Sequence, residues 1–247
     1  MSNETPSIPE WQNRTELLFG EGSYNRLAQS SILIAGAGGV GGFAAEMLVR
    51  AGIGRVLLLD GDIVEKSNCN RQLIALNSTL GRPKTEVWKE RLLDINPDLE
   101  LIIKSDFYAA KEEWSLLLEN HAPFDCVLDA IDTLSPKVAL IEAVLEKKIP
   151  LVSCMGSGAR MDPEKIRTAD IGKTFGCPLA SAVRSRLRKD GINKGFSAVF
   201  STENAIRSAI IESFSRNKRS TVGTVSYMPA AFGCHCAAAV IKKILQK

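Results

Sequence analysis

The feature that most constrains the fold is an unbroken apolar run that ends in a glycine-rich turn. Ile32-Leu33-Ile34-Ala35 predicts a buried strand, Gly36-Ala37-Gly38-Gly39-Val40-Gly41 is a G-x-G-x-x-G turn, and residues 43–51 have a helical pattern. Glycines allow the backbone to approach a ligand closely, and free N–H groups at the start of the next helix attract phosphate. The sequence therefore predicts a nucleotide site, with a purely structural glycine turn as the alternative.

Asp60 strengthens this prediction. It follows Gly36 by 24 residues and stands at the end of a second apolar run, residues 56–59. A carboxylate at a strand end in this position can hold a ribose hydroxyl. The motif alone does not say which nucleotide binds.

Further apolar runs alternate with helical patterns along the first 155 residues. Strands are predicted at 101–103, 127–128 and 151–152, and helices at 84–93 and 136–147, the latter with Ser135 as N-cap. Continuous apolar strands that alternate with amphipathic helices indicate a parallel sheet covered on both faces. We therefore expect an α/β fold with a Rossmann-like, doubly wound, mostly parallel sheet.

The pattern becomes looser after about residue 155. Strands are expected at 165–171 and 196–201, a helix at 178–189, and a short strand at 224–227 before a last helix. Because no Pro/Gly/Ser linker intervenes, these elements should extend the first half as a C-terminal α+β portion. We expect residues 1–13 to be loose and residues 14–247 to form one domain, with a nucleotide half at 14–155 and a second half at 156–247.

Composition excludes several classes of protein. With 45% hydrophobic residues, 24% charged residues and a net charge of +3, the chain is neither disordered nor strongly basic. The longest apolar stretch, residues 228–241, has 14 residues, whereas a membrane span needs about 20. We expect a buried C-terminal helix and no membrane association.

Cysteine spacing and the first residues bear on location and metal content. None of the six cysteines forms a C-x-x-C pair, so no structural zinc is expected. The polar start Met1-Ser2-Asn3-Glu4 lacks the apolar core of a signal peptide. Scattered thiols without a secretion signal favour the cytoplasm.

Two basic residues follow the second strand. Arg71 lies in Ser67-Asn68-Cys69-Asn70-Arg71-Gln72, and Lys84 ends Gly81-Arg82-Pro83-Lys84. A triphosphate carries more negative charge than one helix end can satisfy, and Arg and Lys would offset the excess. The pattern favours ATP, with a solvated basic loop as the alternative.

Two aspartates close the fourth predicted strand in Asp129-Ala130-Ile131-Asp132. Ligands of such folds bind outside the carboxyl ends of the strands, and Mg²⁺ favours one or two carboxylates together with phosphates. Asp132 lies farther from the strand and is the better Mg²⁺ candidate, whereas Asp129 would brace the loop. A structural role for both aspartates is the alternative.

Taken together, these motifs resemble the family that adenylates carboxylates in the manner of ubiquitin-activating enzymes. The resemblance extends over roughly residues 14–245 and rests on the glycine turn, on Leu58-Leu59-Asp60-Gly61-Asp62, and on the three motifs quoted above. It implies an ATP site with Asp60 on the ribose, Gly41 near the α-phosphate and Asp132 on Mg²⁺. It also implies that Arg14 reaches the ATP of a second subunit, and hence a homodimer.

The resemblance assigns further residues to this site. The catalytic residues implied are Arg14, Arg71, Lys84 and Asp132. The nucleotide-binding residues implied are Gly36, Gly38, Gly39, Gly41, Asp60, Asp62, Asn68, Arg71, Gln72, Lys84 and Asp132.

The second half resembles one branch of this family, the tRNA threonylcarbamoyladenosine dehydratases. The similar segments include Met155-Gly156-Ser157-Gly158 and Pro178-Leu179-Ala180. This branch uses ATP to activate the threonine carboxylate of a modified adenosine in tRNA, and internal attack then closes a ring and releases AMP. One departure is Cys177, since the branch usually has Asp before Pro-Leu-Ala.

Basic residues near the end of the predicted helix 178–189 could contact tRNA. Arg184 and Arg188 share a helix face at i,i+4, and Lys189 follows them. Such residues can neutralise phosphates. An exposed basic helix face is the alternative, and the resemblance favours tRNA.

Other functions fit the sequence less well. An adenylating enzyme for a ubiquitin-like sulfur carrier is the main alternative, and the missing C-x-x-C pairs count against it. A nicotinamide dehydrogenase would need a hydride-transfer site that the sequence does not indicate. A non-catalytic scaffold would not need Arg71, Lys84 and Asp132 together.

Overall fold

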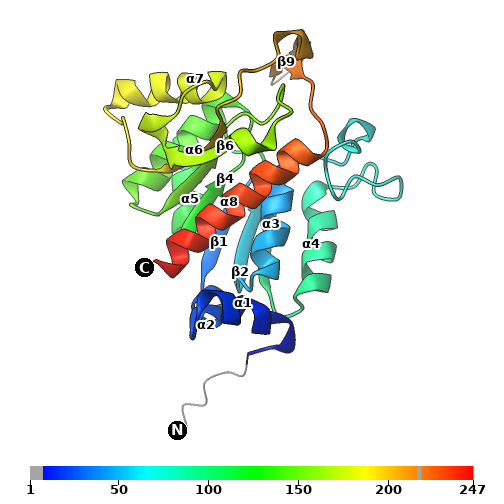
Figure 1. The fold of residues 1–247 in the computed structure, drawn as a ribbon, viewed down its shortest axis with the longest axis vertical. Helices are drawn as coiled ribbons and strands as arrows, with labels where there is room; N and C mark the ends of the chain where they lie inside the picture. Colours follow the sequence, from blue (N-terminus) through cyan, green and yellow to red (C-terminus); the bar gives the residue numbers. More distant parts are fainter. Residues whose placement is uncertain (1–7, 216–217, 247) are drawn as a thin grey trace.

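A sheet of seven strands forms the centre of the protein. The computed structural model describes residues 8–215 and 218–246. The strand order is β3-β2-β1-β4-β5-β7-β6, and all neighbouring strands run parallel except β6, which is antiparallel to β7 (Figure 1). The strands are β1 (Ser31–Ala35), β2 (Arg55–Leu59), β3 (Glu100–Lys104), β4 (Cys126–Asp129), β5 (Leu151–Cys154), β6 (Ile166–Asp170) and β7 (Ser197–Ser201). The expected mostly parallel α/β fold is confirmed.

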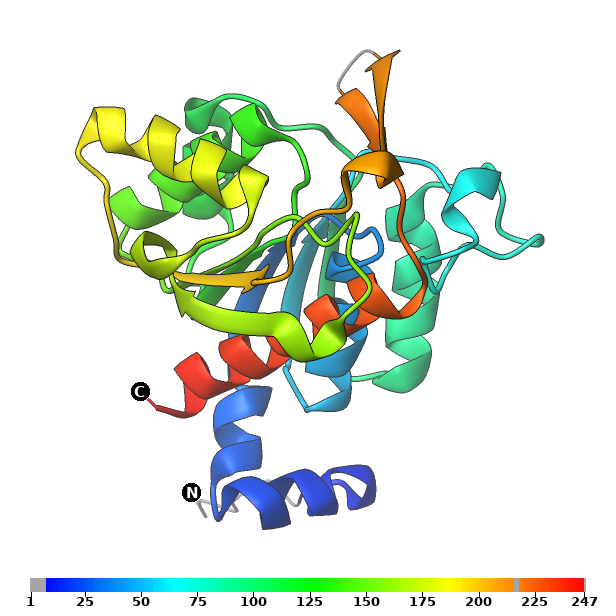
Figure 2. The same ribbon diagram turned by 45° about the horizontal axis from the view of Figure 1, so that its top comes forward.

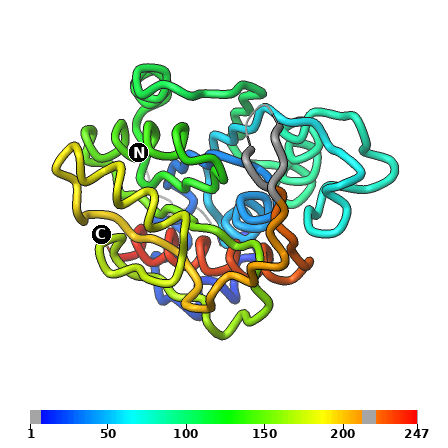
Figure 3. Tube along the Cα trace, turned by 90° about the horizontal axis from the view of Figure 1, so that it is seen from above, coloured from blue at the N-terminus to red at the C-terminus, as the bar shows by residue number. Residues whose placement is uncertain are grey.

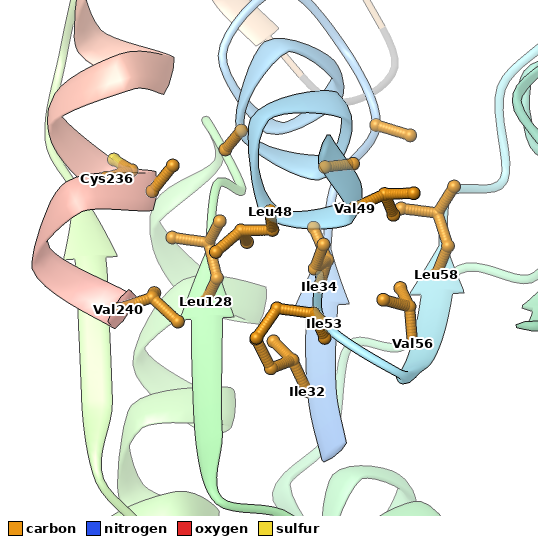
Figure 4. Close-up of a cluster of buried hydrophobic side chains, with 14 of the residues drawn as sticks. Ile32, Ile34, Leu48, Val49, Ile53, Val56, Leu58, Leu128, Cys236 and Val240 are labelled. Carbon is orange, nitrogen blue, oxygen red and sulfur yellow. The ribbon is translucent and has the colours of Figure 1, made fainter. Parts of the chain in front are cut away.

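Alternate residues of each strand build two separate hydrophobic cores. Ile32 and Ile34 of β1 pack under α3 (Gly41–Arg50), α4 (Lys84–Ile95) and α8 (Tyr227–Leu245). Figure 4 shows these two side chains with Leu48 of α3 and Val240 of α8. Leu33 and Ala35 point to the other face, which α5 (Lys111–Asn120), α6 (Leu134–Glu146) and α7 (Pro178–Leu187) cover. The continuous apolar runs in the sequence result from burial on both faces.

The C-terminal helix covers the sheet. Met228, Phe232, Cys236 and Val240 are fully buried and follow one another at a spacing of four residues, so they form one face of α8. By length and composition, α8 is the one helix among the described residues that could cross a membrane. Of an 18-residue window of this helix, 44% is buried within the protein. The expected strand at 224–227 is wrong, because Tyr227 is already the first residue of this helix.

Two other boundaries differ from expectation. Helix α6 begins at Leu134, after Thr133, and not at Pro136, since proline is compatible with any position of the first helical turn. Of the expected loose segment 1–13, residues 1–7 lie outside the described residues. Residues Glu10–Gln12 form a 3-10 turn, and the buried Gln12 donates a hydrogen bond to the carbonyl of Arg50 at 2.9 Å.

Helices α1 (Asn13–Phe19) and α2 (Ser23–Ala28) lie at the amino ends of the strands. The carbonyl of Leu27 accepts from Gly54 and that of Ser30 from Arg55, just where β2 begins. Figure 1 shows both helices below the sheet, at the end opposite the loops that follow β1 and β2.

A hairpin projects from the carboxyl ends of the strands. Its strands are β8 (Ile210–Ser215) and β9 (Lys218–Val222) (Figure 2). Ala159 anchors its base by donating to the carbonyl of Gly223 and accepting from Ile206. The chain then passes beside the amino end of α3 into α8, where a Cβ on Gly39 would lie 3.0 Å from Pro229 (Figure 3).

Candidate active site

The glycine turn between β1 and α3 is packed so closely that side chains are excluded. A Cβ on Gly41 would lie 1.8 Å from the carbonyl oxygen of Gly36. Gly36 itself has φ +94°, and a Cβ there would lie 2.9 Å from the carbonyl oxygen of Ala130. Only glycine fits both positions, because backbone atoms on the other side cannot move away.

Ala37, in the middle of this turn, is held at both polar atoms. Its N–H donates to Asp60 Oδ2 at 2.7 Å, and its carbonyl accepts from the buried indole of Trp88 at 2.9 Å. Sequence reasoning missed Trp88, which lies on α4 and is fully buried. The two contacts fix the turn against β2 and α4.

The turn leaves several backbone donors open. Within the described part of the chain, the N–H groups of residues 38–41 have no protein acceptor, and no side chain caps α3. Donors of this kind at a helix start, together with the helix dipole, form an anion site. The geometry therefore suits a phosphate group.

Asp60 and Lys84 meet beside the turn, at the carboxyl end of β2. The second oxygen of Asp60 accepts from the N–H of Asp62 at 2.9 Å, and Lys84 Nζ lies 3.9 Å away. Burial raises the pKa of the Asp60 carboxyl, and the charge of Lys84 and the two N–H donors oppose this effect. Asp60 is thus already bonded to the protein, and a carboxylate can accept further hydrogen bonds.

Lys84 is almost completely buried and pairs with the exposed Asp62 at 2.6 Å. It returns to this edge after 22 residues because a bridge between Ile63 and Pro83 closes the intervening loop. The ammonium group therefore lies at the edge of the sheet where the expected phosphates would bind.

Arg71, Asn68 and Gln72 occupy the closed loop. The carbonyl oxygen of Arg71 would lie 3.2 Å from a Cβ on Gly39, so Arg71 lies beside the glycine turn. Its guanidinium donates to the carbonyl of Ser67 at 2.9 Å. Asn68 is buried and accepts from the N–H of Glu65, which closes a capping box in its own turn. Its side chain thus supports the shape of the loop.

Gln72 is the polar side chain of this loop that packs on the turn. It is 8% exposed, its Nε2 would lie 3.7 Å from a Cβ on Gly38, and its Oε1 is buried without a partner. A buried acceptor without a donor is costly. Gln72 therefore has one unused acceptor and presents its amide nitrogen to the turn.

Asp129 and Asp132 differ sharply in their surroundings. Asp129 is fully buried and accepts from Ser153 at 2.5 Å and from Lys137 at 2.7 Å. Lys137 also donates to the carbonyl of Ile131 at 2.8 Å, so the pair holds the loop that leads to Asp132. Asp132 is exposed at the carboxyl end of β4. Sequence reasoning missed Lys137 and Ser153.

Arg14 is not brought to this site within one chain. It is exposed on α1, at the amino ends of the strands, whereas the glycine turn follows the carboxyl end of β1 (Figure 1). A five-residue strand spans about 16 Å, so the two groups lie at opposite ends of the strands.

The basic residues of α7 form a separate group. Arg184 donates to the hydroxyl of Thr174, and together with Arg188 it lines a small pocket of about 220 Å³. Asn193, which lines the same pocket, lies near the amino end of β7. Lys189 is exposed in the next turn. These side chains are therefore not part of the cluster around the glycine turn.

Comparison with known proteins identifies the relatives of this fold. A model of the ThiF family matches residues 12–247. The chain is 44% identical over 194 residues to the tRNA threonylcarbamoyladenosine dehydratase of Bacillus subtilis (strain 168), a match that covers 78% of this chain and 75% of that protein. It is 37% identical over 241 residues to the dehydratase of the same name from Haemophilus influenzae (strain ATCC 51907 / DSM 11121 / KW20 / Rd), with 93% and 91% covered.

The solved structures agree with the sequence matches. The fold is similar to the crystal structure of Escherichia coli tRNA N6-threonylcarbamoyladenosine dehydratase, TcdA, in complex with ATP, with a TM-score of 0.86 and 35% identity. The match covers 95% of this chain and 93% of that chain. A complex of the same enzyme with AMP matches with a TM-score of 0.84. From the family model and these relatives together, the chain belongs to the ThiF family.

Proposed function

We propose that this protein is an ATP-dependent tRNA-modifying enzyme. It adenylates the threonine carboxylate of threonylcarbamoyladenosine in tRNA and promotes its cyclisation, a dehydration that releases AMP. The observation that carries the proposal is the cradle of open N–H groups at residues 38–41 with Lys84 beside it, in a chain similar over most of its length to dehydratases of this name.

The residues at the carboxyl ends of β1 and β2 fit ATP. The N–H groups of the turn and the positive end of α3 suit the α-phosphate near Gly41, and Lys84 and Arg71 add positive charge for the other phosphates. Asp60 remains close enough to the turn to accept from a ribose hydroxyl. We assign ATP binding to Gly36, Gly38, Gly39, Gly41, Asp60, Asp62, Asn68, Arg71, Gln72, Lys84 and Asp132.

Asp132 is the residue that would hold Mg²⁺. In the described part of the chain no group of three or more His, Cys, Asp or Glu side chains could bind a metal. A single carboxylate with phosphate oxygens is a common way to bind Mg²⁺. The ion would neutralise charge that develops on the phosphates.

Adenylation solves the main chemical difficulty of the reaction. Hydroxide is a poor leaving group, so a carboxylate does not cyclise readily. Attack of a carboxylate oxygen on the α-phosphorus expels pyrophosphate and gives an acyl-adenylate, from which AMP leaves easily. The nucleophile that closes the ring belongs to the substrate. The protein therefore has to bind, orient and stabilise charge, and it needs no catalytic cysteine.

We further propose that the enzyme is a homodimer in which Arg14 of one subunit completes the ATP site of the other. Leu17 and Leu18 on α1 are 86% and 77% exposed, so this helix presents an apolar surface beside Arg14. Large exposed apolar side chains that adjoin one another often mark an interface. Residues 14–247 would act as one catalytic domain.

The tRNA phosphates would be contacted by a basic group at one side of the molecule, which consists of Arg184, Arg188 and Lys189.

We place the enzyme in the cytoplasm, since all six cysteines are free.

Mass spectrometry of bulk tRNA nucleosides would test the function. A strain that lacks this protein should lose the cyclised nucleoside and accumulate the open form, and the wild-type gene should restore it. With purified components, AMP release should depend on ATP and on tRNA that carries threonylcarbamoyladenosine, and tRNA without this group is the control. If AMP forms only when a ubiquitin-like carrier protein is added, the alternative function is correct.

A further inference from the structure

Arg160 is a buried cation that forms no ion pair with the residues that the structure describes. It is 3% exposed and lies in the loop after β5. Its Nη1 donates to the carbonyls of Gly156 at 2.6 Å and Gly158 at 3.0 Å, and its Nε donates to that of Glu203 at 3.2 Å. Its Nη2 is buried and has no partner, and no ion pair joins it to a carboxylate of the described residues. A buried guanidinium that meets only neutral carbonyls is destabilising unless a negative charge joins it.

The carboxylate of Glu203 does not fill this role. Its oxygens accept instead from the backbone N–H groups of Met161, at 3.1 Å, and Asp162, at 3.0 Å. Arg160 therefore has a free donor on a charged group, and the carboxylate of Glu203, which follows β7, is already bonded to backbone N–H groups.

The amino end of α7 lies beside Arg160 and is also unsatisfied. Cys177 is its N-cap, and the thiol makes no capping hydrogen bond. Pro178 has no N–H, and those of Leu179 and Ala180 have no protein acceptor among the residues that the structure describes. A ten-residue helix that begins in this way presents open donors and a positive dipole end.

Gly156 joins the two features. An atom at the position of its missing Cβ would lie 3.7 Å from Arg160 Nη1, 3.8 Å from Leu179 Cβ and 3.9 Å from Cys177 Sγ. These are ordinary contact distances, so the guanidinium of Arg160 and the first turn of α7 both pack around Gly156. The two positive groups therefore lie close to each other.

We propose that Arg160 and the amino end of α7 form a binding site for an oxyanion, a carboxylate or a phosphate. The site lies after the carboxyl end of β5, next to strand β4, whose loop carries Asp132. It is distinct from the glycine turn, which follows β1 on the other side of β4. One oxygen of the anion would accept from Nη2 and another from the open N–H groups. The anion is either a free small molecule or a group of the tRNA, and the second source rests on the proposed function.

Thermal unfolding with inorganic phosphate tests the site. A saturating non-hydrolysable ATP analogue fills the glycine turn first, so that any remaining response comes from elsewhere. At a phosphate concentration of roughly ten times Kd, Tm of the wild type should rise by about 3 °C. Arg160→Gln should abolish this rise. Arg186→Gln removes the same charge from an exposed position of α7 and should retain it.

A second pair of variants tests the site even if Arg160→Gln does not fold. Cys177→Asp places a carboxylate and a good N-cap beside Arg160, so it should raise Tm without phosphate and remove the phosphate response. Cys177→Asn supplies the cap without the charge and should keep the response. The proposal is overturned if the wild type does not respond, if Arg160→Gln responds as the wild type does, or if Cys177→Asp lowers Tm.

Kinetics with tRNA separates the two sources. If the anion belongs to the tRNA, Arg160→Gln should raise KM for tRNA about tenfold and leave KM for ATP unchanged. If KM for tRNA is unchanged while the phosphate response is lost, a free anion occupies the site. The Tm shift caused by the ATP analogue alone reports whether ATP binds, so a failure of the proposed function is visible separately.

Discussion

Asp129 and Asp132 are two nearby carboxylates with very different surroundings. Both oxygens of Asp129 are occupied, one by the N–H of Ile131 and the other by Ser153 and Lys137. Removing one partner of such a buried pair is strongly destabilising, about 3–5 kcal/mol. Asp132 is exposed at the end of the same loop. It is therefore the carboxylate to which we assign the metal ion in the proposed function.

Asp132→Asn should abolish turnover and leave the fold intact. Asn keeps the shape of the side chain and loses the charge that would hold Mg²⁺ against the phosphates. AMP release measures turnover, and thermal unfolding measures the fold. Glu119→Gln, a charge change at an exposed residue of α5, is the control and should retain full activity. Unchanged turnover in Asp132→Asn would exclude Asp132 from the site.

The sequence indicated Asp132 but not the group that positions it. The prediction for Asp132 rests on its strand end and spacing, which are visible in the chain. Lys137 is one of 31 Lys and Arg residues, and nothing in its local pattern marks it as buried. Its role depends on Ser153, which the pairing of β4 with β5 brings opposite Asp129. Contacts that arise from strand pairing cannot be predicted from one segment at a time.

In the β1–turn–α3 element, some glycines are required by the fold and others by the expected ligand. Gly41→Ala would place a Cβ 1.8 Å from a backbone oxygen, so it should lower the free energy of unfolding by more than about 3 kcal/mol. Gly38→Ala would meet nothing closer than 3.7 Å, so it should change stability by less than about 1 kcal/mol. Its methyl group would nevertheless crowd the open N–H groups and weaken ATP binding. Urea unfolding and calorimetry with ATP measure the two effects. Equal loss of stability in both variants would contradict this distinction.

Helices α3 and α4 are joined by a charged clamp. Glu46 of α3, whose side chain is 6% exposed, accepts from Arg91 of α4 at 2.6 Å and from Arg50 at 2.9 Å. Burial tends to raise the pKa of the Glu46 carboxyl, but the hydrogen bonds from Arg91 and Arg50 outweigh it, and the net pKa is lowered. The clamp holds α4, which supplies Lys84 and Trp88, against the helix of the glycine turn.

Glu46→Gln should therefore lower the stability at neutral pH, by about 1–2 kcal/mol because both arginines are half-exposed. Since the folded pKa lies below the usual value of 4.5, the contribution is complete above that pH and is lost as pH falls through the folded pKa. Urea unfolding of both proteins from pH 7 to pH 3 measures this. A stability difference that stays constant down to pH 3 would show that the charge of Glu46 is not responsible.

At the scale of helices and strands, most of the sheet could be predicted from the sequence, but the ends of some helices and strands could not. Strands buried on both faces leave a continuous apolar signal, as Ile32–Ala35 does. The start of α8 was misread because Thr224-Val225-Ser226-Tyr227 contains residues that favour strands. There the packing of Met228 and Phe232 on the sheet overrides local preference.

At the scale of the whole molecule, the two ends of the sheet carry different parts of the proposed machinery. The glycine turn, Lys84 and Asp132 lie at the carboxyl ends of the strands. Arg14 lies at the amino ends, on a helix with exposed Leu17 and Leu18. A role for Arg14 in catalysis therefore requires a second copy of the chain. A closed two-fold pair would have two equivalent sites, each with one arginine from its partner.

Mixed dimers provide the decisive measurement of this arrangement. Arg14→Ala should lose activity and still dimerise, because an arginine at the phosphates stabilises developing charge and the apolar surface of α1 remains. Asp132→Ala should also be inactive. A heterodimer of the two variants combines one intact Arg14 with one intact Asp132 in a single site, so activity should return to about half that of the wild-type dimer. Co-expression with two affinity tags isolates this heterodimer. If it forms and stays inactive, Arg14 does not act across the interface, because the only site free of both substitutions would still fail.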